Sequence, residues 1–155
     1  MRLRHIAPLV VLVMLSATQF VAVAAVPYDA CTLASRADVA KAVGGGTVSP
    51  GRLHRYAGDP VSECQYDTEA GNVVVTFDPT NHSQFFSAVR ASYGVLETVP
   101  GIGDGAVYSK EHGTLAFRKG NANVLLTLDT PDEVRGCTVV VALARRIAPR
   151  LKRER

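Results

Sequence analysis

The sequence predicts an α+β domain in which a mostly antiparallel sheet of about six strands packs against three helices. Two observations support this fold class. Short runs rich in β-branched residues are joined by tight turns, which is typical of antiparallel strands. Three segments with the helical spacing of apolar residues lie before, between and after these runs. The resulting order is α-β-β-β-α-β-β-β-α, which suggests a two-fold internal repeat.

The first half opens with a short helix. Ser35 and Asp38 fit a capping box, in which the serine hydroxyl accepts a hydrogen bond from the third helical amide. The glycine run at 44–46 ends this helix. Strands are predicted over residues 47–56, 61–66 and 72–78. The last of these, Asn-Val-Val-Val-Thr-Phe-Asp, is the clearest, and Gly71 marks the hairpin turn before it.

The second half repeats this order. Residues 81–84 form another capping-box pattern. Phe85, Phe86, Val89 and Tyr93 line one face of a helix that ends at Gly94. Strands are predicted over residues 106–110, 114–118 and 123–129, with a hairpin turn at 119–121.

A third helix opens with Thr130 as its N-cap and Glu133 as the partner of Thr130 in a capping box. Pro131 occupies the first helical position, where the amide that it lacks would have no partner in the helix. One apolar stripe follows, made of Val134, Cys137, Val140 or Val141, Ala144, Ile147 and Leu151. Three consecutive β-branched residues at 139–141 are poor helix formers. A strand over residues 137–143 is therefore the alternative to this helix.

The first 25 residues have the three parts of a Sec-type signal peptide. A basic start with Arg2 and Arg4 is followed by an apolar stretch over residues 6–15 and a small-residue end at 22–25. An uncleaved membrane anchor over residues 6–26 is the alternative, because about 20 apolar residues span a bilayer. We favour cleavage on either side of Ala25, which makes the protein extracytoplasmic, either secreted or periplasmic, and not an integral membrane protein.

We expect residues 26–151 to form one domain and residues 152–155 a basic tail. Residues 26–144 carry nine Lys or Arg against thirteen Asp or Glu, whereas residues 145–155 carry six against one. Cations at the end of a helix complement its dipole. The alternative is weak contact with an anionic surface through Arg145, Arg146, Arg150, Lys152 and Arg153. Nucleic acid is not expected as a partner, because export removes the protein from it.

Three cysteines, Cys31, Cys64 and Cys137, remain after cleavage. An oxidising compartment permits a disulfide. Three pairings are possible, and each leaves one thiol over. Because Cys137 falls on the apolar stripe of the last helix, we expect it to be buried as a small hydrophobic residue.

Several motifs occur along the chain in a recognisable order. They are Asp-Ala-Cys-Thr-Leu at 29–33, a short helix ending at Val43-Gly44, Cys-Gln-Tyr at 64–66, Val-Pro-Gly-Ile-Gly-Asp-Gly-Ala at 99–106 and Leu-Ala-Phe-Arg-Lys-Gly at 115–120. With these motifs the chain resembles, over most of residues 29–151, the small bacterial exported proteins and lipoproteins grouped as domain of unknown function 3558.

The resemblance implies an extracytoplasmic α+β domain with a disulfide matching Cys31 and Cys64, the pairing that we predict. It implies no activity, since none is established for the family as a whole. Many similar proteins carry a lipid on a cysteine. Here Tyr28 stands where an acylation box needs an aliphatic residue, so we do not expect a lipid.

The sequence contains none of the familiar catalytic or metal-binding patterns. The loop at 101–105 reads Gly-x-Gly-x-Gly and precedes a strand, whereas a phosphate-binding loop precedes a helix. His54, His82 and His112 are far apart, and no Cys-x-x-Cys or Gly-x-Ser-x-Gly occurs. We therefore predict no catalytic, cofactor or metal site.

These features favour a non-enzymatic binding or interaction module of the cell envelope, whose partner is an unknown protein or envelope component. An inhibitor of a secreted hydrolase and, less favoured, a small envelope enzyme are the alternatives. The candidate interaction loop comprises Pro100, Gly101, Ile102, Gly103 and Asp104. A module that binds a ligand would have an apolar cleft between sheet and helices.

Overall fold

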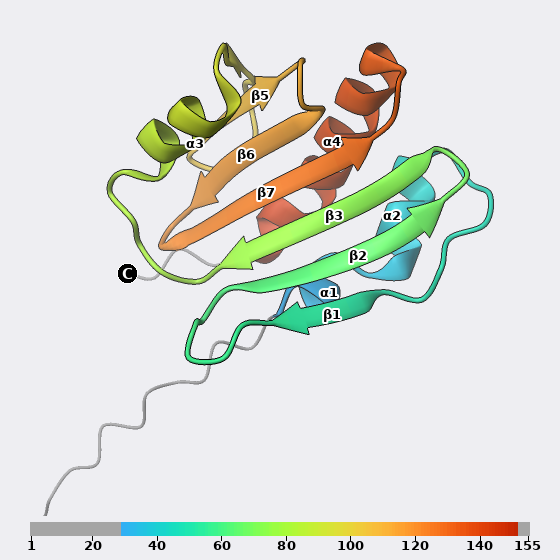
Figure 1. Cartoon of the computed structure of the whole chain (residues 1–155), viewed down its shortest axis with the longest axis horizontal. Coiled ribbons are helices and arrows are strands. Elements are labelled where there is room, and N and C mark those ends of the chain that lie inside the picture. Colours follow the sequence, from blue (N-terminus) through green and yellow to red (C-terminus); the bar gives the residue numbers. More distant parts are fainter. Residues whose placement is uncertain (1–28, 152–155) are drawn as a thin grey trace, which may run out of the picture.

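The computed structural model describes residues 29–151, so the predicted signal peptide and the tail at 152–155 lie outside the described residues. The fold is α+β, as predicted, with one seven-stranded antiparallel sheet in the order β1-β2-β3-β7-β6-β5-β4 (Figure 1). The strands are β1 (Arg52–Arg55), β2 (Ser62–Thr68), β3 (Gly71–Asp78), β4 (Glu97–Thr98), β5 (Gly105–Ser109), β6 (Thr114–Lys119) and β7 (Ala122–Asp129). The helices are α1 (Ala30–Leu33), α2 (Arg36–Ala42), α3 (Phe85–Tyr93) and α4 (Glu133–Ile147), and a 3-10 turn follows at Ala148–Arg150.

The short elements α1 and β4 are the additions to the predicted order. The two halves of the predicted repeat meet where β3 pairs with β7. β1-β2-β3 form one side of the sheet and β7-β6-β5 the other, with β4 at the edge beyond β5. The helices do not follow this repeat. In Figure 1 α3 lies in front of the sheet, whereas α1, α2 and α4 lie behind it. The repeat is therefore one of strand order alone.

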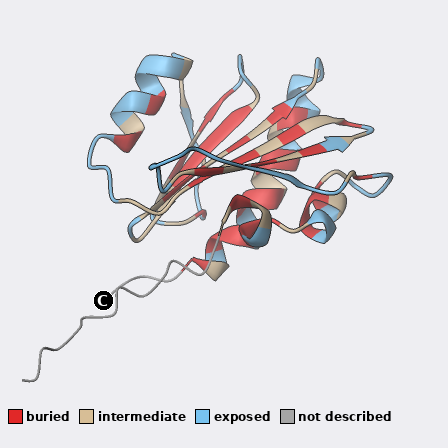
Figure 2. Ribbon diagram, turned by 60° about the horizontal axis from the view of Figure 1, so that its bottom comes forward, coloured by how far each residue is buried: buried red, intermediate tan, exposed pale blue. Residues whose placement is uncertain are grey.

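The main core lies between the sheet and the α1, α2 and α4 layer. Alternate residues of β3, namely Val73, Val75 and Phe77, are buried on this side, and Leu126 and Leu128 continue the layer on β7. This is the period-two pattern that an antiparallel strand shows when one of its faces is buried. Buried residues accordingly concentrate on the sheet and on the helix surfaces that face it (Figure 2).

On the other face, α3 covers only part of the sheet. Phe85 and Val89 pack against Ala116 of β6 in a second, smaller apolar cluster. The guanidinium of Arg118 lies 5.6 Å from the ring centre of Phe86, which adds a cation–π contact. On β2 and β3 the same face carries partly exposed residues, Glu63, Gln65, Val74 and Thr76.

The disulfide between Cys31 and Cys64 joins α1 to β2, as predicted. The Tyr66 hydroxyl donates to the Ala34 carbonyl in the same region. Ser35 caps α2 in the predicted capping box with Asp38. These contacts fix the amino-terminal helices on the sheet.

Helix α4 differs from the prediction at its start and in its buried face. Asp132, and not Thr130, is the N-cap, since its carboxylate accepts from the Arg135 amide at 3.0 Å. The buried residues are Gly136, Val139, Val140, Leu143, Ala144 and Ile147. Val139 and Leu143 lie on this face in place of Val134 and Cys137, and Val134 is left 78% exposed.

The alternative strand over residues 137–143 is wrong, because burial of α4 outweighs the modest helix propensity of three valines. Cys137 is only partly buried, at the edge of the buried face. In the part of the chain that the structure describes, no helix has the length and apolar composition needed to cross a membrane.

Candidate binding site

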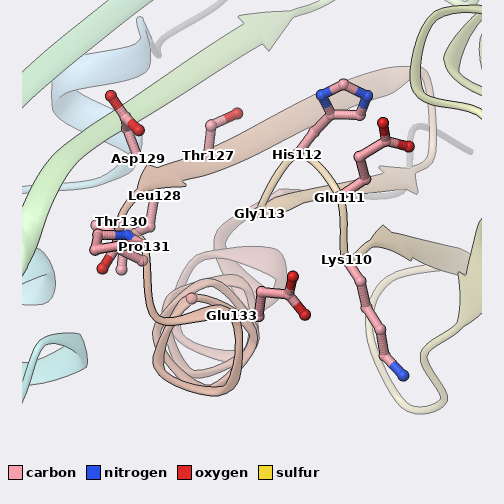
Figure 3. A pocket seen from close by; sticks show the side chains of 11 residues that line it. Lys110, Glu111, His112, Gly113, Thr127, Leu128, Asp129, Thr130, Pro131 and Glu133 are labelled. Atoms are coloured by element: carbon pink, nitrogen blue, oxygen red, sulfur yellow. The ribbon is translucent and has the colours of Figure 1, made fainter.

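A hollow of about 600 Å³ lies at the end of the sheet where the β5–β6 turn approaches the connection from β7 to α4 (Figure 3). Lys110, Glu111 and His112 come from the turn. Asp129 and Glu133 come from the connection and the first turn of α4. The side chains from these two segments border the same space, so the fold gathers five ionisable groups from two segments that are separate in the sequence.

Backbone contacts hold the β5–β6 turn in place. The Gly113 carbonyl accepts from the Leu128 amide at 3.2 Å, which fastens the turn to β7. The Thr114 hydroxyl lies 3.0 Å from the Thr127 hydroxyl and also donates to the His112 carbonyl. The His112 ring meets Tyr93 edge to face, with the ring centres 5.3 Å apart. The charged side chains thus project from a fixed backbone.

The hollow has an excess of negative charge. Lys110 Nζ lies 2.8 Å from the Glu97 carboxylate, and this bond raises the pKa of Lys110. The cation is therefore matched by a carboxylate outside the lining of the hollow. Within residues 29–151 no ion pair involves Glu111, Asp129 or Glu133, and all three are exposed.

A second cavity, a groove of about 340 Å³ between β5 and α4, adjoins the hollow and shares Lys110 and Glu133 with it. Its other lining residues are Tyr108, Val134, Cys137 and Thr138. The exposed Val134 and the partly buried Cys137 thiol give this groove an apolar wall. It is a cleft between sheet and helix of the kind that a ligand-binding module requires.

Tyr108 forms the floor of the groove. Its hydroxyl donates to the Glu133 carbonyl at 3.4 Å, and its side chain is almost fully buried. Burial raises the pKa of Tyr108, and the nearby Cys137 and Glu133 act in the same direction. The phenol is therefore neutral at neutral pH and serves as a hydrogen-bond donor.

The larger pKa shifts occur at contacts that hold the amino-terminal helices. Hydrogen bonds from Arg150 lower the pKa of Asp38 to about 2. Burial raises the pKa of Tyr66 to about 12. Burial also opposes ionisation of Asp29, but hydrogen bonds from Thr32 and Arg55 outweigh it and lower the pKa. Each shift is explained by a structural contact.

The predicted interaction loop lies between β4 and β5 and is tightly anchored. Ile102 is buried in the main core, which leaves Pro100, Gly101 and Asp104 exposed. The Asp104 carboxylate accepts from the Gly120 amide at 2.8 Å, so the loop is fastened to the β6–β7 turn. Its role in binding stays a prediction, and any contact with a partner would come from the exposed residues.

The structure does not bring the three histidines together. His54 lies on β1, His82 precedes α3, and His112 lies in the β5–β6 turn. Among residues 29–151 no group of three or more His, Cys, Asp or Glu side chains is arranged to hold a metal ion.

Of the basic residues near the carboxyl end, Arg150 is drawn inward. Its guanidinium bonds Asp38 and the Leu33 carbonyl. Arg145 and Arg146 are exposed, whereas Lys152 and Arg153 lie outside the described residues. Contact with an anionic surface therefore stays a prediction. The guanidinium of Arg150 is less available for it than those of Arg145 and Arg146, because it bonds Asp38 and the Leu33 carbonyl.

Sequence reasoning missed both the hollow and the groove. The run Lys110-Glu111-His112 in a tight turn is the one local signal of the hollow. The groove has none, because it depends on the rotation of α4 that leaves Val134 exposed. Comparisons of the chain with models of protein families, with curated proteins and with solved structures gave no match. The family resemblance therefore stays a prediction.

Proposed function

We propose that this domain is an exported, non-enzymatic binding module that holds its ligand in the hollow and the groove between β5 and α4. The observation that carries the proposal is the continuity of two unlike cavities. A polar hollow and an apolar groove share Lys110 and Glu133, so a single ligand can place a charged group in one and an apolar group in the other.

The largest pKa shifts lie outside the proposed site, although burial raises the pKa of Tyr108 and the bond to Glu97 raises the pKa of Lys110. An active site typically gathers groups whose pKa values are strongly perturbed. Here the groups with the largest shifts, Asp38 and Tyr66, make contacts that join the amino-terminal helices to Arg150 and to β2, away from the hollow and the groove. The inhibitor alternative would use the loop at 100–104, but Ile102 points into the core, so this loop offers little apolar surface to a target enzyme.

An extracytoplasmic location is part of the proposal. The disulfide between Cys31 and Cys64 is compatible with an oxidising compartment. If the leader is cleaved as expected, the exported protein begins at Ala25 or Val26. Sequencing of its amino terminus tests this, and a product that keeps Met1 would contradict cleavage.

Site-directed photo-crosslinking in the producing cell tests the binding site. A benzoylphenylalanine replaces Thr138, which lines the groove, or Ala37, which is exposed on α2 and serves as the matched control. We expect a specific adduct from position 138 and none from position 37. Absence of an adduct at 138, or equal adducts at both positions, would refute the proposed site.

A further inference from the structure

The outer edge of β4 is an unpaired strand edge beside the groove. β4 is the last strand of the sheet, and it pairs only with β5 in the described part of the chain. The Val99 amide donates inward to the Ala106 carbonyl at 3.0 Å. Because backbone groups alternate along a strand, the amide and carbonyl of Thr98 point outward. An exposed edge of this kind can accept an added strand.

The groove lies where the side chains of an added strand would point. Glu97 pairs with Tyr108, and paired residues share one face of a sheet. Tyr108 is the floor of the groove, so this face looks toward α4. A strand added to β4 would direct every second side chain to that side, against Val134 and Thr138.

The negative charge of the hollow restricts the charge of any side chain that an added strand places there. Glu111, Asp129 and Glu133 border the hollow, and its one lysine is bonded to Glu97. A Lys or Arg side chain of the ligand would meet three carboxylates there, whereas an acidic one would be repelled.

We propose that the ligand is an extended peptide segment of a partner protein that adds to the outer edge of β4. It places an apolar side chain in the groove against Val134 and a neighbouring Lys or Arg side chain in the hollow. This inference rests on the proposed function, since it names the occupant of the same site.

Selection of random short peptides displayed on phage, with the exported disulfide-bonded protein as bait, tests the peptide chemistry. We expect selected sequences in which apolar residues alternate along the segment and a Lys or Arg flanks them. Failure to select peptides, or selection of acidic ones, would overturn the inference. Release of a lipid or another small amphiphile from the denatured native protein would also overturn it.

Paired variants of β4 test strand addition. Thr98→Pro removes an outward amide and leaves the bonds to β5 intact, whereas Thr98→Ala keeps that amide. We expect Thr98→Pro to weaken binding of a selected peptide by about tenfold or more, and Thr98→Ala to retain it. Val134→Asp should weaken it to a similar extent, because it places a carboxylate in the apolar groove. Equal binding by the two Thr98 variants, each with an unchanged unfolding temperature, would rule out strand addition.

The two proposals fail in different ways. An adduct at position 138 without peptide binding would leave the binding site in place and remove the peptide as its occupant. Absence of both would remove the site and the ligand together.

Discussion

The guanidinium of Arg150 holds the carboxylate of Asp38 through two hydrogen bonds of 2.7 and 2.8 Å. The two residues are 112 positions apart, and the same guanidinium also bonds the Leu33 carbonyl at the end of α1. The carboxyl-terminal turn is thereby fastened to α1 and α2, which the disulfide fastens to β2. The first and last elements of the described chain are thereby held onto the core.

Replacement of the cation of this ion pair should destabilise the fold. Arg150→Met leaves the Asp38 carboxylate desolvated and without its cation, so we expect a loss of about 2 kcal/mol in the free energy of unfolding. Chemical denaturation measures it. Arg146→Met is the matched control, because Arg146 is exposed and its loss should change stability by less than about 0.5 kcal/mol. Equal effects of the two variants would contradict this role for Arg150.

The same pair predicts a pH dependence. The pKa of Asp38 falls from 3.8 to about 2 in the folded protein. A carboxyl whose pKa is lowered by folding contributes stability above its unfolded pKa and loses it as the pH falls through the folded value. The wild type should therefore lose about 2 kcal/mol from this group between about pH 4 and pH 2. In Asp38→Asn the free energy of unfolding should fall less over this pH range. Its dependence on pH is measured by chemical denaturation, and parallel curves for the variant and the wild type would contradict the role of Asp38.

Removal of the disulfide should cost more than removal of the ion pair. Cys31 and Cys64 close a loop with a sequence separation of 33 residues. In the chain-entropy model such a cross-link stabilises by about 3–4 kcal/mol. We expect the double variant Cys31→Ala, Cys64→Ala to lose about this much free energy of unfolding in urea, relative to the oxidised wild type. A loss below about 1 kcal/mol would show that the reduced chain is restrained by other contacts.

The sequence predicted those parts of the fold that have strong local causes. Strand alternation located β3 and β7, and the capping box at Ser35 located α2, because these features depend on neighbouring residues alone. β4 was missed because two residues cannot show a period. The face of α3 was predictable, but the side of the sheet on which it packs was not.

The site depends on features with no local signature. Val134 is exposed because α4 buries Val139, Leu143 and Ile147 instead, where the helix packs against β6 and β7. At the hollow, the Gly113 carbonyl accepts from the Leu128 amide of the neighbouring strand, and the connection from β7 to α4 borders the same space. Long-range contacts of this kind decide where side chains meet, and a single sequence does not display them.

The loop between β4 and β5 offers a direct test of backbone packing. Gly103 has a φ of +57°, and an added Cβ would lie 2.2 Å from the Arg118 carbonyl oxygen. Gly101 has a φ of +76°, but its Cβ would meet open space. Both alanine variants incur the strain of a left-handed conformation, about 1–2 kcal/mol. Gly103→Ala should be clearly more destabilising in thermal unfolding, and equal losses would show that the loop yields without disturbing β6.

Cys137 should report on the groove. It is the one free cysteine of the described chain, and its partly buried thiol lines the cavity beside Tyr108 and Val134. The native oxidised protein should therefore react with a thiol reagent at one site, more slowly than it does after unfolding, since burial limits access. A peptide selected for binding should slow this reaction further, because it would cover the thiol. Mass spectrometry of the modified protein over time measures both rates.

Variants with a moved cysteine are the control. Thr138→Cys in a Cys137→Ala background should show the same protection, whereas a cysteine placed at Ala37 should show none. Full reactivity of Cys137 in the presence of saturating peptide would mean that the peptide binds elsewhere.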